Sequence, residues 1–221
     1  MKNDMLRLLT PDDSAIVLLD HQAQSLFSVQ SHERESIINH VIALVEVAKV
    51  FKVPTVVSIL DSQNFGGPLF QELEPVLSGL ELIDRTSINA WEDKRFQSAI
   101  KETGRKNLAI AGLSTESAVT LTALSAMRDN YEVFIVADAC GSASREVHER
   151  ALDRMFRAGA IPTAWQQVAY ELQADWARQE TAEPLRQIIR HHCGGFAPGV
   201  FQPQAMHAAG QEKAQTTTRV S

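Results

Sequence analysis

The sequence predicts an α/β protein in which a parallel sheet lies between two layers of helices. Short apolar runs of strand length alternate with longer segments whose apolar residues recur at helical spacing. Several short runs are apolar at almost every position, as expected for strands that are buried on both faces. This alternation favours parallel strands joined by right-handed crossovers, with ligands bound at the carboxyl ends of the strands.

The first half of the chain supplies three predicted strands. "AIVLLD" (15–20) is a buried strand that ends in an acid, and "ESIINHVIALVEVAKVF" (35–51) has apolar residues at helical spacing. "TVVSIL" (55–60) is the second strand, and a loop containing Gly and Pro follows it at 61–70. "LELIDR" (80–85) is a weaker third strand.

The second half continues the alternation. Its predicted strands are 107–112, 132–139 and a short 160–165, and its predicted helices are 93–104, 115–130, 145–159 and 166–179. Gly104 and Gly159 follow two of these helices, in the position that glycine commonly takes at a helix C-terminus.

Length and composition favour one globular domain. The chain has 221 residues, of which 44% are hydrophobic and 22% are charged. We expect a single domain over residues 1–195. Residues 196–221 lose periodicity and predict a tail that is flexible or lies against a partner subunit. The net charge of −6, without a Lys/Arg cluster, argues against nucleic-acid binding.

The remaining bulk features predict a cytoplasmic protein with no membrane partner. Cys140 and Cys193 provide neither a disulfide framework nor a CxxC metal spacing. The first residues, "MKNDMLRLLTPDDS", lack the features of a signal peptide, and no apolar run approaches the roughly 20 residues needed to span a bilayer.

Three predicted strands end in residues that could carry chemistry. Asp20 ends the first strand beside the apolar core, where its pKa should rise and allow proton exchange. Arg85 ends the third strand and could hold an acid ionised or bind a substrate oxygen. Backbone N–H groups of "GLSTESA" (112–118), at a helix N-terminus, could stabilise an oxyanion.

Each feature also has a structural interpretation. An Asp after a buried strand often caps the next segment, and Arg85 could be a surface cation. "STES" (114–117) is a capping signal with Ser114 or Thr115 as the cap. The joint placement of all three at one edge of one sheet is what favours the functional interpretation.

The residues resemble a known family. "VLLDHQ" (17–22), "DRTSINAWED" (84–93), "LAIAGLSTESAVTLTALSAM" (108–127) and "VFIVADACGS" (133–142) are similar to the isochorismatase-like, or cysteine hydrolase, superfamily, and in particular to its YcaC-like branch. The similarity extends from about residue 8 to residue 176. It implies a Rossmann-like sheet of strand order 3-2-1-4-5-6.

The resemblance also implies a site. The family uses an Asp, a Lys or Arg, and a Cys; the Asp corresponds to Asp20 and the basic residue, an Arg in this branch, to Arg85. The oxyanion turn corresponds to the backbone of Leu113, Ser114 and residue 118, with a cis peptide expected at Leu113–Ser114. No metal and no cofactor are implied.

The nucleophile position departs from the family. Ala118 stands where the family has its Cys, and a methyl group cannot attack an amide, nitrile or imide. Ser117 is adjacent, but one helical step turns its side chain by about 100° and it has no obvious His base. Cys140 fits a small core residue, and "HHC" (191–193) lacks structural-zinc spacing.

Further residues are expected to bind a small-molecule substrate. They are Gln22, Phe27, Phe65, Asn89, Trp91 and Thr115. Trp91 and Phe65 would form an apolar wall, while Gln22 and Asn89 would orient a polar group. For the two aromatic residues, plain packing or a subunit contact is an equal alternative.

Three functions remain open from the sequence. The first is a small-molecule hydrolase acting on a C–N or related bond, if Ala118 replaces a Cys. The second is an Asp20-driven hydrolysis without a covalent intermediate, as in true isochorismatases, which carry a small residue at this position. The third is a silent binding or scaffold protein. The resemblance implies a homo-oligomer, a tetramer or octamer, in which neighbouring chains line the pocket.

Overall fold

Six parallel strands form one sheet in the order β3-β2-β1-β4-β5-β6. The structure is a computed structural model and describes residues 6–193. The strands are β1 (Ser14–Leu19), β2 (Thr55–Leu60), β3 (Leu82–Arg85), β4 (Asn107–Gly112), β5 (Glu132–Val136) and β6 (Ile161–Thr163). The predicted fold class and strand order are confirmed.

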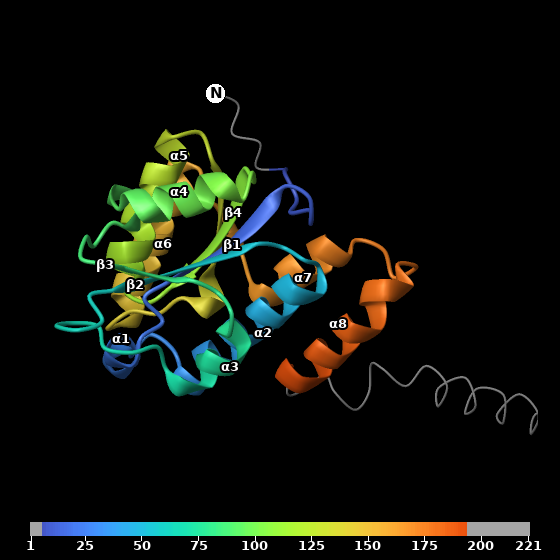
Figure 1. The fold of residues 1–221 in the computed structure, drawn as a ribbon, viewed down its shortest axis with the longest axis horizontal. Coiled ribbons are helices and arrows are strands. Elements are labelled where there is room, and N and C mark those ends of the chain that lie inside the picture. The colour runs from blue at the N-terminus through green and yellow to red at the C-terminus, as the bar shows by residue number, and fades with distance from the viewer. Residues whose placement is uncertain (1–5, 194–221) are drawn as a thin grey trace, which may run out of the picture.

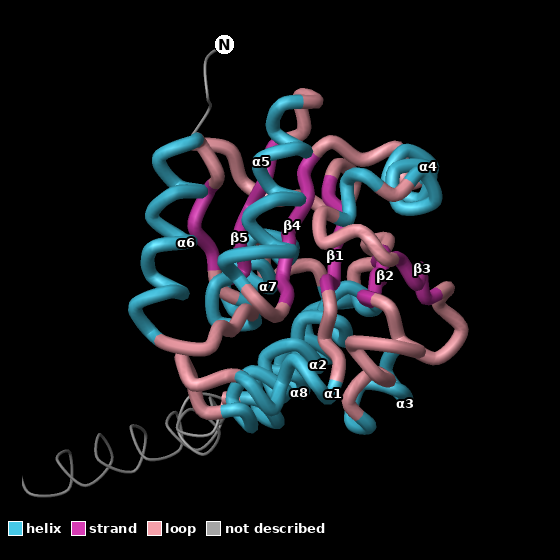
Figure 2. Tube along the Cα trace, turned by 90° about the vertical axis from the view of Figure 1, so that its left-hand side faces the viewer, coloured by secondary structure: helices cyan, strands magenta, loops and turns pink. Residues whose placement is uncertain are grey.

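Helices cover both faces of this sheet (Figure 1). One layer holds α2 (Arg34–Val50), α7 (Trp165–Gln173) and α8 (Gln179–His192), and the other holds α4 (Lys94–Glu102), α5 (Thr120–Arg128) and α6 (Arg145–Ala158). Two short helices, α1 (Ala23–Ser28) and α3 (Glu74–Leu77), lie in segments that follow β1 and β2. Figure 2 shows the same layers in a view turned by 90°.

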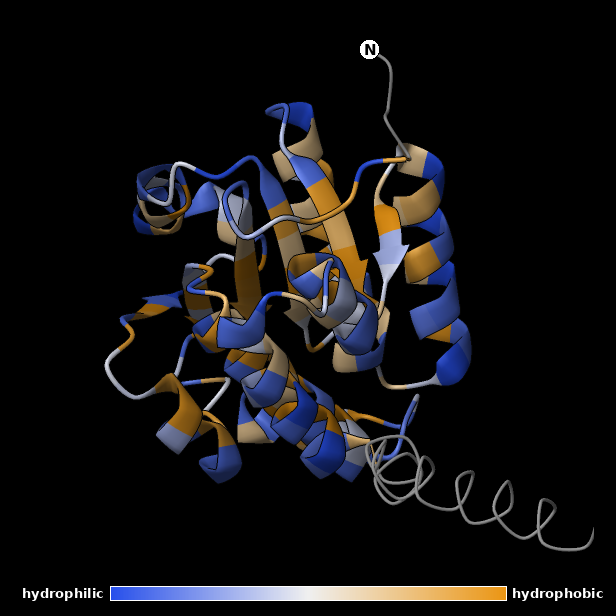
Figure 3. Ribbon diagram, turned by 90° about the vertical axis from the view of Figure 1, so that its right-hand side faces the viewer, coloured by the Kyte–Doolittle hydropathy of each residue, from blue (hydrophilic) through white to orange (hydrophobic). Residues whose placement is uncertain are grey.

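The core follows from the composition of the central strands. All six residues of β1 and all six of β4 are buried, because each strand has neighbours on both sides and helices on both faces. Figure 3 shows the apolar strands enclosed by helices with mixed outer surfaces. No helix within residues 6–193 combines the length and apolar character that crossing a bilayer requires.

Close packing fixes the neighbouring ends of β1 and β4. Leu19 pairs with Gly112, and the Leu113 N–H donates to the Leu19 carbonyl at 3.0 Å. A Cβ on Gly112 would lie 2.7 Å from the Leu19 carbonyl oxygen and 2.8 Å from the Val119 side chain. The absence of a side chain at residue 112 therefore lets the segment after β4 pack directly on the end of β1.

Several boundaries differ from those predicted. The strand predicted over 132–139 ends at Val136, and a 3₁₀ turn (Ala137–Ala139) follows it. The helix predicted over 166–179 ends at Gln173, since Ala174 takes a left-handed conformation with φ 53°. The separate helix α8 was not predicted. The tail predicted over 196–221 lies outside the described residues.

Candidate functional site

The predicted acid and base meet directly. Asp20 follows β1 and Arg85 ends β3, and the arginine Nη2 lies 2.8 and 2.9 Å from the two carboxylate oxygens of Asp20. Both side chains are almost completely buried, with 0% exposure for Arg85 and 4% for Asp20. This is an ion pair inside the protein, where a charge without a partner would be very costly.

The environment of the pair tunes its chemistry. Burial raises the pKa of Asp20 from 3.8 to about 6, although the charge of Arg85 and the hydrogen bond from it act in the opposite direction. The Arg85 Nη1 donates to the carbonyl of Ser87 at 2.7 Å, and its Nε has no partner among the described residues. A carboxyl group with a pKa near neutrality can both accept and release a proton at working pH.

Backbone strain gathers at the same edge of the sheet. Asp20 directly follows β1 and has a φ angle of 55°. Asp61 directly follows β2 with a φ angle of 38°, and Ser114, two residues after β4, has a φ angle of 58°. Such left-handed conformations are unfavourable for residues with a side chain and often occur at functional sites. Three neighbouring strands therefore end in sharp reversals around one region.

The segment after β4 forms the predicted turn, with one correction. The peptide bond expected to be cis at Leu113–Ser114 is not, and no cis bond occurs within residues 6–193. Instead Ser114, with φ 58° and ψ 65°, reverses the chain. Its side chain makes no capping hydrogen bond, so the capping interpretation of Ser114 is also wrong.

The helix that follows begins with a π-helical turn. Residues Thr115–Val119 form this turn before α5, and the Thr120 hydroxyl donates to the Thr115 carbonyl at 2.6 Å. Such π turns occur frequently at functional sites. Ala118 lies within it and is 1% exposed. Since β1 and β4 are neighbours about 4.8 Å apart, this turn starts next to Asp20.

Thr115 connects the turn to the segment after β5 and to α6. Its N–H and its hydroxyl both donate to the Gly141 carbonyl, each at 3.1 Å, and the hydroxyl also lies 2.9 Å from Nδ1 of His148. The side chain is fully buried. These contacts occupy the hydroxyl that was expected to bind substrate.

The two amides expected to orient a substrate are engaged within the chain. Gln22 accepts from the Leu60 N–H at 2.8 Å and donates to the carbonyls of Leu60 and Gly67 at 3.1 and 2.6 Å. Asn89 accepts from the Trp91 N–H and donates to the Ser125 hydroxyl at 3.0 Å. Gln22 therefore anchors the loop after β2, and Asn89 caps a short turn after β3.

The predicted apolar wall of Trp91 and Phe65 is wrong. Trp91 is buried, donates from Nε1 to Asp129 at 2.7 Å and packs edge-on against Tyr131, which lies just before β5 at the opposite edge of the sheet. Phe65 follows β2 at the carboxyl edge and is 64% exposed. For Trp91 the packing alternative holds.

Phe27 lies on α1 and is also at the surface. It is 69% exposed, and the Arg34 guanidinium sits 5.9 Å from its ring centre. In a single chain neither Phe27 nor Phe65 is enclosed. Contact with substrate and contact with a neighbouring subunit both remain predictions for these two rings.

The cysteines offer no second nucleophile. Cys140 is fully buried, and burial raises the pKa of its thiol to about 12. The Cys193 thiol accepts from the Gln166 amide at 2.7 Å, and its pKa is raised by burial. Within residues 6–193 no three His, Cys, Asp or Glu side chains are grouped closely enough to hold a metal.

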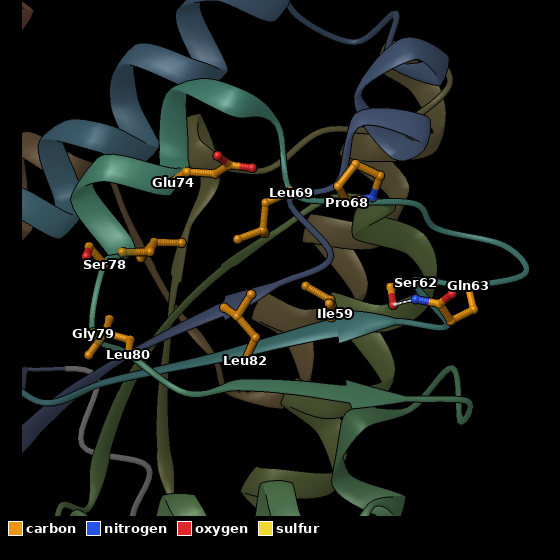
Figure 4. A pocket seen from close by; sticks show the side chains of 11 residues that line it. Ile59, Ser62, Gln63, Pro68, Leu69, Glu74, Ser78, Gly79, Leu80 and Leu82 are labelled. Carbon is orange, nitrogen blue, oxygen red and sulfur yellow. Dashed lines mark hydrogen bonds between the residues drawn. The ribbon is translucent and has the colours of Figure 1, made fainter.

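The hollows described on the surface lie away from these groups. One of about 530 Å³ lies between β2, β3 and α3, where Ile59, Leu69 and Leu82 surround it and Glu74 lies at its rim (Figure 4). Others, of about 750 and 580 Å³, adjoin the start of α8 and the side of α7. None of the three is lined by Asp20, Arg85 or residue 118, and these three residues are buried in the single chain.

Sequence reasoning missed the residues that brace the turn. Gly141 and Ser142 follow β5, and His148 lies in the first turn of α6. Ser142 donates from its hydroxyl to Glu116 at 2.7 Å, and its N–H donates to the Ser31 hydroxyl at 3.0 Å. The "CGS" (140–142) that follows the predicted fifth strand was a usable signal, because it too lies at the carboxyl edge.

The comparisons with known proteins agree with this fold. Residues 14–167 match the isochorismatase domain. The protein named probable hydrolase YcaC from Escherichia coli is 38% identical over 185 residues, which cover 83% of this chain and 88% of the relative.

Two solved structures have the same architecture. YcaC from Pseudomonas aeruginosa, solved with hexane-2,5-diol and covalent acrylamide, gives a TM-score of 0.83 at 33% identity and covers 92% of this chain and 98% of that one. Escherichia coli YcaC, described as an octameric hydrolase of unknown specificity, gives 0.82 at 35% identity over 92% and 97%. This chain therefore belongs to the isochorismatase family.

Proposed function

We propose that this protein is a small-molecule hydrolase of the isochorismatase family whose reaction depends on Asp20. The buried contact between Asp20 and Arg85 is the observation that carries the proposal. A carboxyl group with a pKa of about 6 is suited to general acid and base chemistry near neutral pH. The name of the Escherichia coli relative supports a hydrolase.

Each site residue has a role in the proposed reaction that follows from its position. Asp20 transfers the proton, and Arg85 stabilises its ionised form and fixes its two oxygens. The backbone N–H groups of Ser114 and Ala118 stabilise negative charge that develops on a substrate oxygen. The Leu113 N–H, which was expected to share this role, donates instead to the Leu19 carbonyl. The low-dielectric surroundings strengthen each of these interactions.

Residue 118 decides which route is open. If Ala118 replaces a Cys, Asp20 would take the proton of a thiol there, and the thiolate would attack the carbon of a C–N bond. Asp20 would return the proton to the departing nitrogen, and water would then hydrolyse the thioester. The Pseudomonas aeruginosa relative, which holds a covalent acrylamide, supports covalent chemistry in this branch. With Ala118 present, the second candidate is hydrolysis by water, in which Asp20 protonates the substrate and no covalent intermediate forms.

The electrostatics favour an uncharged substrate. Arg85 is already neutralised by Asp20, and its Nη1 is used by the Ser87 carbonyl. Asp61 immediately follows β2, and Asp138, which lies 3.7 Å from His40, is the second residue after β5. A dianionic substrate would meet net negative charge here, so small neutral amides, nitriles and imides are the compounds to screen.

The test compares four proteins on one substrate panel. They are the protein with Ala118 as found, the Ala118→Cys variant, and Asp20→Asn in each of these two backgrounds. Activity that appears only with Ala118→Cys and disappears with Asp20→Asn supports the thiol route, and activity with Ala118 that requires Asp20 supports the water route. An Ala118→Cys variant whose introduced thiol reacts with iodoacetamide, but which hydrolyses nothing, contradicts the thiol route.

A silent binding protein is the remaining alternative. It predicts ligand binding without turnover in any of these backgrounds. Calorimetric titration with the compounds of the same panel detects this binding. A compound that binds but is not hydrolysed, with or without Asp20→Asn, supports a binding protein over an enzyme.

We also propose that the protein is a homo-oligomer. Phe27, Phe65 and Ile88 are more than half exposed, and each follows one of three adjacent strands, β1, β2 and β3, at the carboxyl edge. An exposed apolar rim of this kind favours a subunit contact, and Escherichia coli YcaC is octameric. Light scattering should give a mass of four or eight chains. The cytoplasmic location stays a prediction.

A further inference from the structure

We propose that His148 is a positioning residue: a neutral imidazole on α6 that holds the turn carrying residue 118 through the Thr115 hydroxyl. The inference rests on the proposed function only in taking that turn as part of the active site. His148 is 5% exposed, and none of the steps above uses it.

The hydrogen-bond pattern assigns the donor. The Thr115 hydroxyl has one proton, and the Gly141 carbonyl at 3.1 Å is a pure acceptor for it. The contact of 2.9 Å between Thr115 Oγ1 and His148 Nδ1 therefore has the imidazole N–H as donor. The ring then acts as a neutral donor, and burial, which lowers the pKa of His148 to about 4, favours that neutral form.

The Gly141 carbonyl binds Thr115 to the segment after β5. It accepts from both the N–H and the hydroxyl of Thr115, and the Gly141 N–H donates to the Gly112 carbonyl at 3.3 Å. A Cβ on Gly141 would lie 2.8 Å from the Ile37 side chain, so this segment has little freedom to move. The turn is thus held against the segment after β5, and His148 adds the contact from α6.

A second side chain braces the same turn from nearby. The buried Ser142 donates to the Glu116 carboxylate at 2.7 Å. His148 itself is backed by His32, whose ring lies edge-on at 4.7 Å and whose Nδ1 contacts the Ser31 hydroxyl at 2.9 Å. Thr115 and Glu116, the first two residues of the π-helical turn, are therefore both held by side chains from outside it, and only Ser117 separates them from position 118.

The expected effect is on the chemistry of a group at position 118. Backbone N–H groups of a first helical turn favour a thiolate. If the turn loses its brace and becomes mobile, that stabilisation weakens and the pKa of a thiol at 118 rises. A general loss of stability elsewhere in α6 would not have this result.

The experiment titrates the thiol introduced by Ala118→Cys through its ultraviolet thiolate absorbance, with the matching Ala118 protein subtracted. In that background His148→Ala should lower the thiolate fraction at neutral pH by about threefold or more, equivalent to about half a pKa unit. His148→Asn should restore it, because the Asn amide N–H replaces Nδ1–H. Hydrogen exchange of the 113–118 amides should change in parallel.

Met155→Ala is the matched control. It truncates another buried side chain of α6, two helical turns from His148, and should destabilise the protein without moving the titration. If His148→Ala does not fold, Thr115→Val removes the hydroxyl from the other side of the contact and should act in the same direction.

An unchanged titration of the introduced thiol in a folded His148→Ala or Thr115→Val variant overturns the inference, as does a His148→Asn variant no better than His148→Ala. Hydrolysis is not needed for this result. If no substrate is turned over and the titration behaves as expected, the proposed function fails while the positioning role stands.

Discussion

Replacement of Asp20 by Asn should change how stability depends on pH. In the folded protein the pKa of Asp20 is raised to about 6, against 3.8 for an unburied carboxyl. The folded state therefore binds a proton more tightly than the unfolded chain. Ionisation of Asp20 costs stability that is fully retained below about pH 4 and is lost as pH rises through 6.

The structure sets the magnitude of this effect. The difference between 3.8 and about 6 corresponds to about 3 kcal/mol of stability. Asn is neutral at every pH and resembles protonated Asp20, whereas the parent carries the ionised pair above about pH 6. The stability of Asp20→Asn relative to the parent should therefore rise by about 3 kcal/mol between pH 4 and pH 7.

Urea unfolding followed by the fluorescence of the buried Trp91 and Trp165 measures this difference. Protein concentration must be held fixed, because an oligomer's stability depends on it. Asp153→Asn is the control, since it removes an exposed carboxylate from α6. A stability difference between Asp20→Asn and the parent that stays within about 1 kcal/mol from pH 4 to pH 7 would falsify the proposed electrostatics of the site.

Three other substitutions test the packing around the site. Gly112→Ala places a methyl against Leu19 and should cost about 1–3 kcal/mol in urea unfolding. Gln22→Ala removes three hydrogen bonds that anchor the loop after β2; it should cost about 3 kcal/mol and speed hydrogen exchange over residues 61–70, whereas unchanged exchange would contradict the anchoring role. Trp91→Phe loses only the bond to Asp129, so we expect about 1 kcal/mol lower stability and an unchanged thiol titration in the Ala118→Cys background.

The proximity of Asp20 and Arg85 could be predicted because both residues lie at strand ends, whereas the strand order was implied by the family resemblance. Buried runs such as β1 and β4 are recognisable in the sequence, and a parallel sheet brings their carboxyl ends to one edge. The family resemblance then supplied the order that makes β1 and β4 neighbours. Once the order is known, residues at the ends of neighbouring strands are placed about one strand spacing apart, and those of β1 and β3 about two.

The amides and aromatic residues were harder to predict, because their partners lie far away in the sequence. Gln22 contacts residues 60 and 67, and Trp91 contacts Asp129, 38 residues later. Periodicity and spacing do not reveal such contacts. The left-handed Ser114 was missed for a different reason: serine before a helix is usually a cap, and here the tight join with β1 requires a reversal instead.

The burial that raises the pKa of Asp20 also lowers the stability of the fold. As whole residues, Asp20, Arg85 and Ala118 are each at most 3% exposed, and three strand ends around them are strained. A protein that only needed stability could replace such a pair by apolar residues. The buried pair, the strained reversals and the braced turn thus all favour a functional site here, whichever atom attacks the substrate. Under the proposed function, the methyl at residue 118 provides no nucleophile but leaves Asp20 able to transfer a proton.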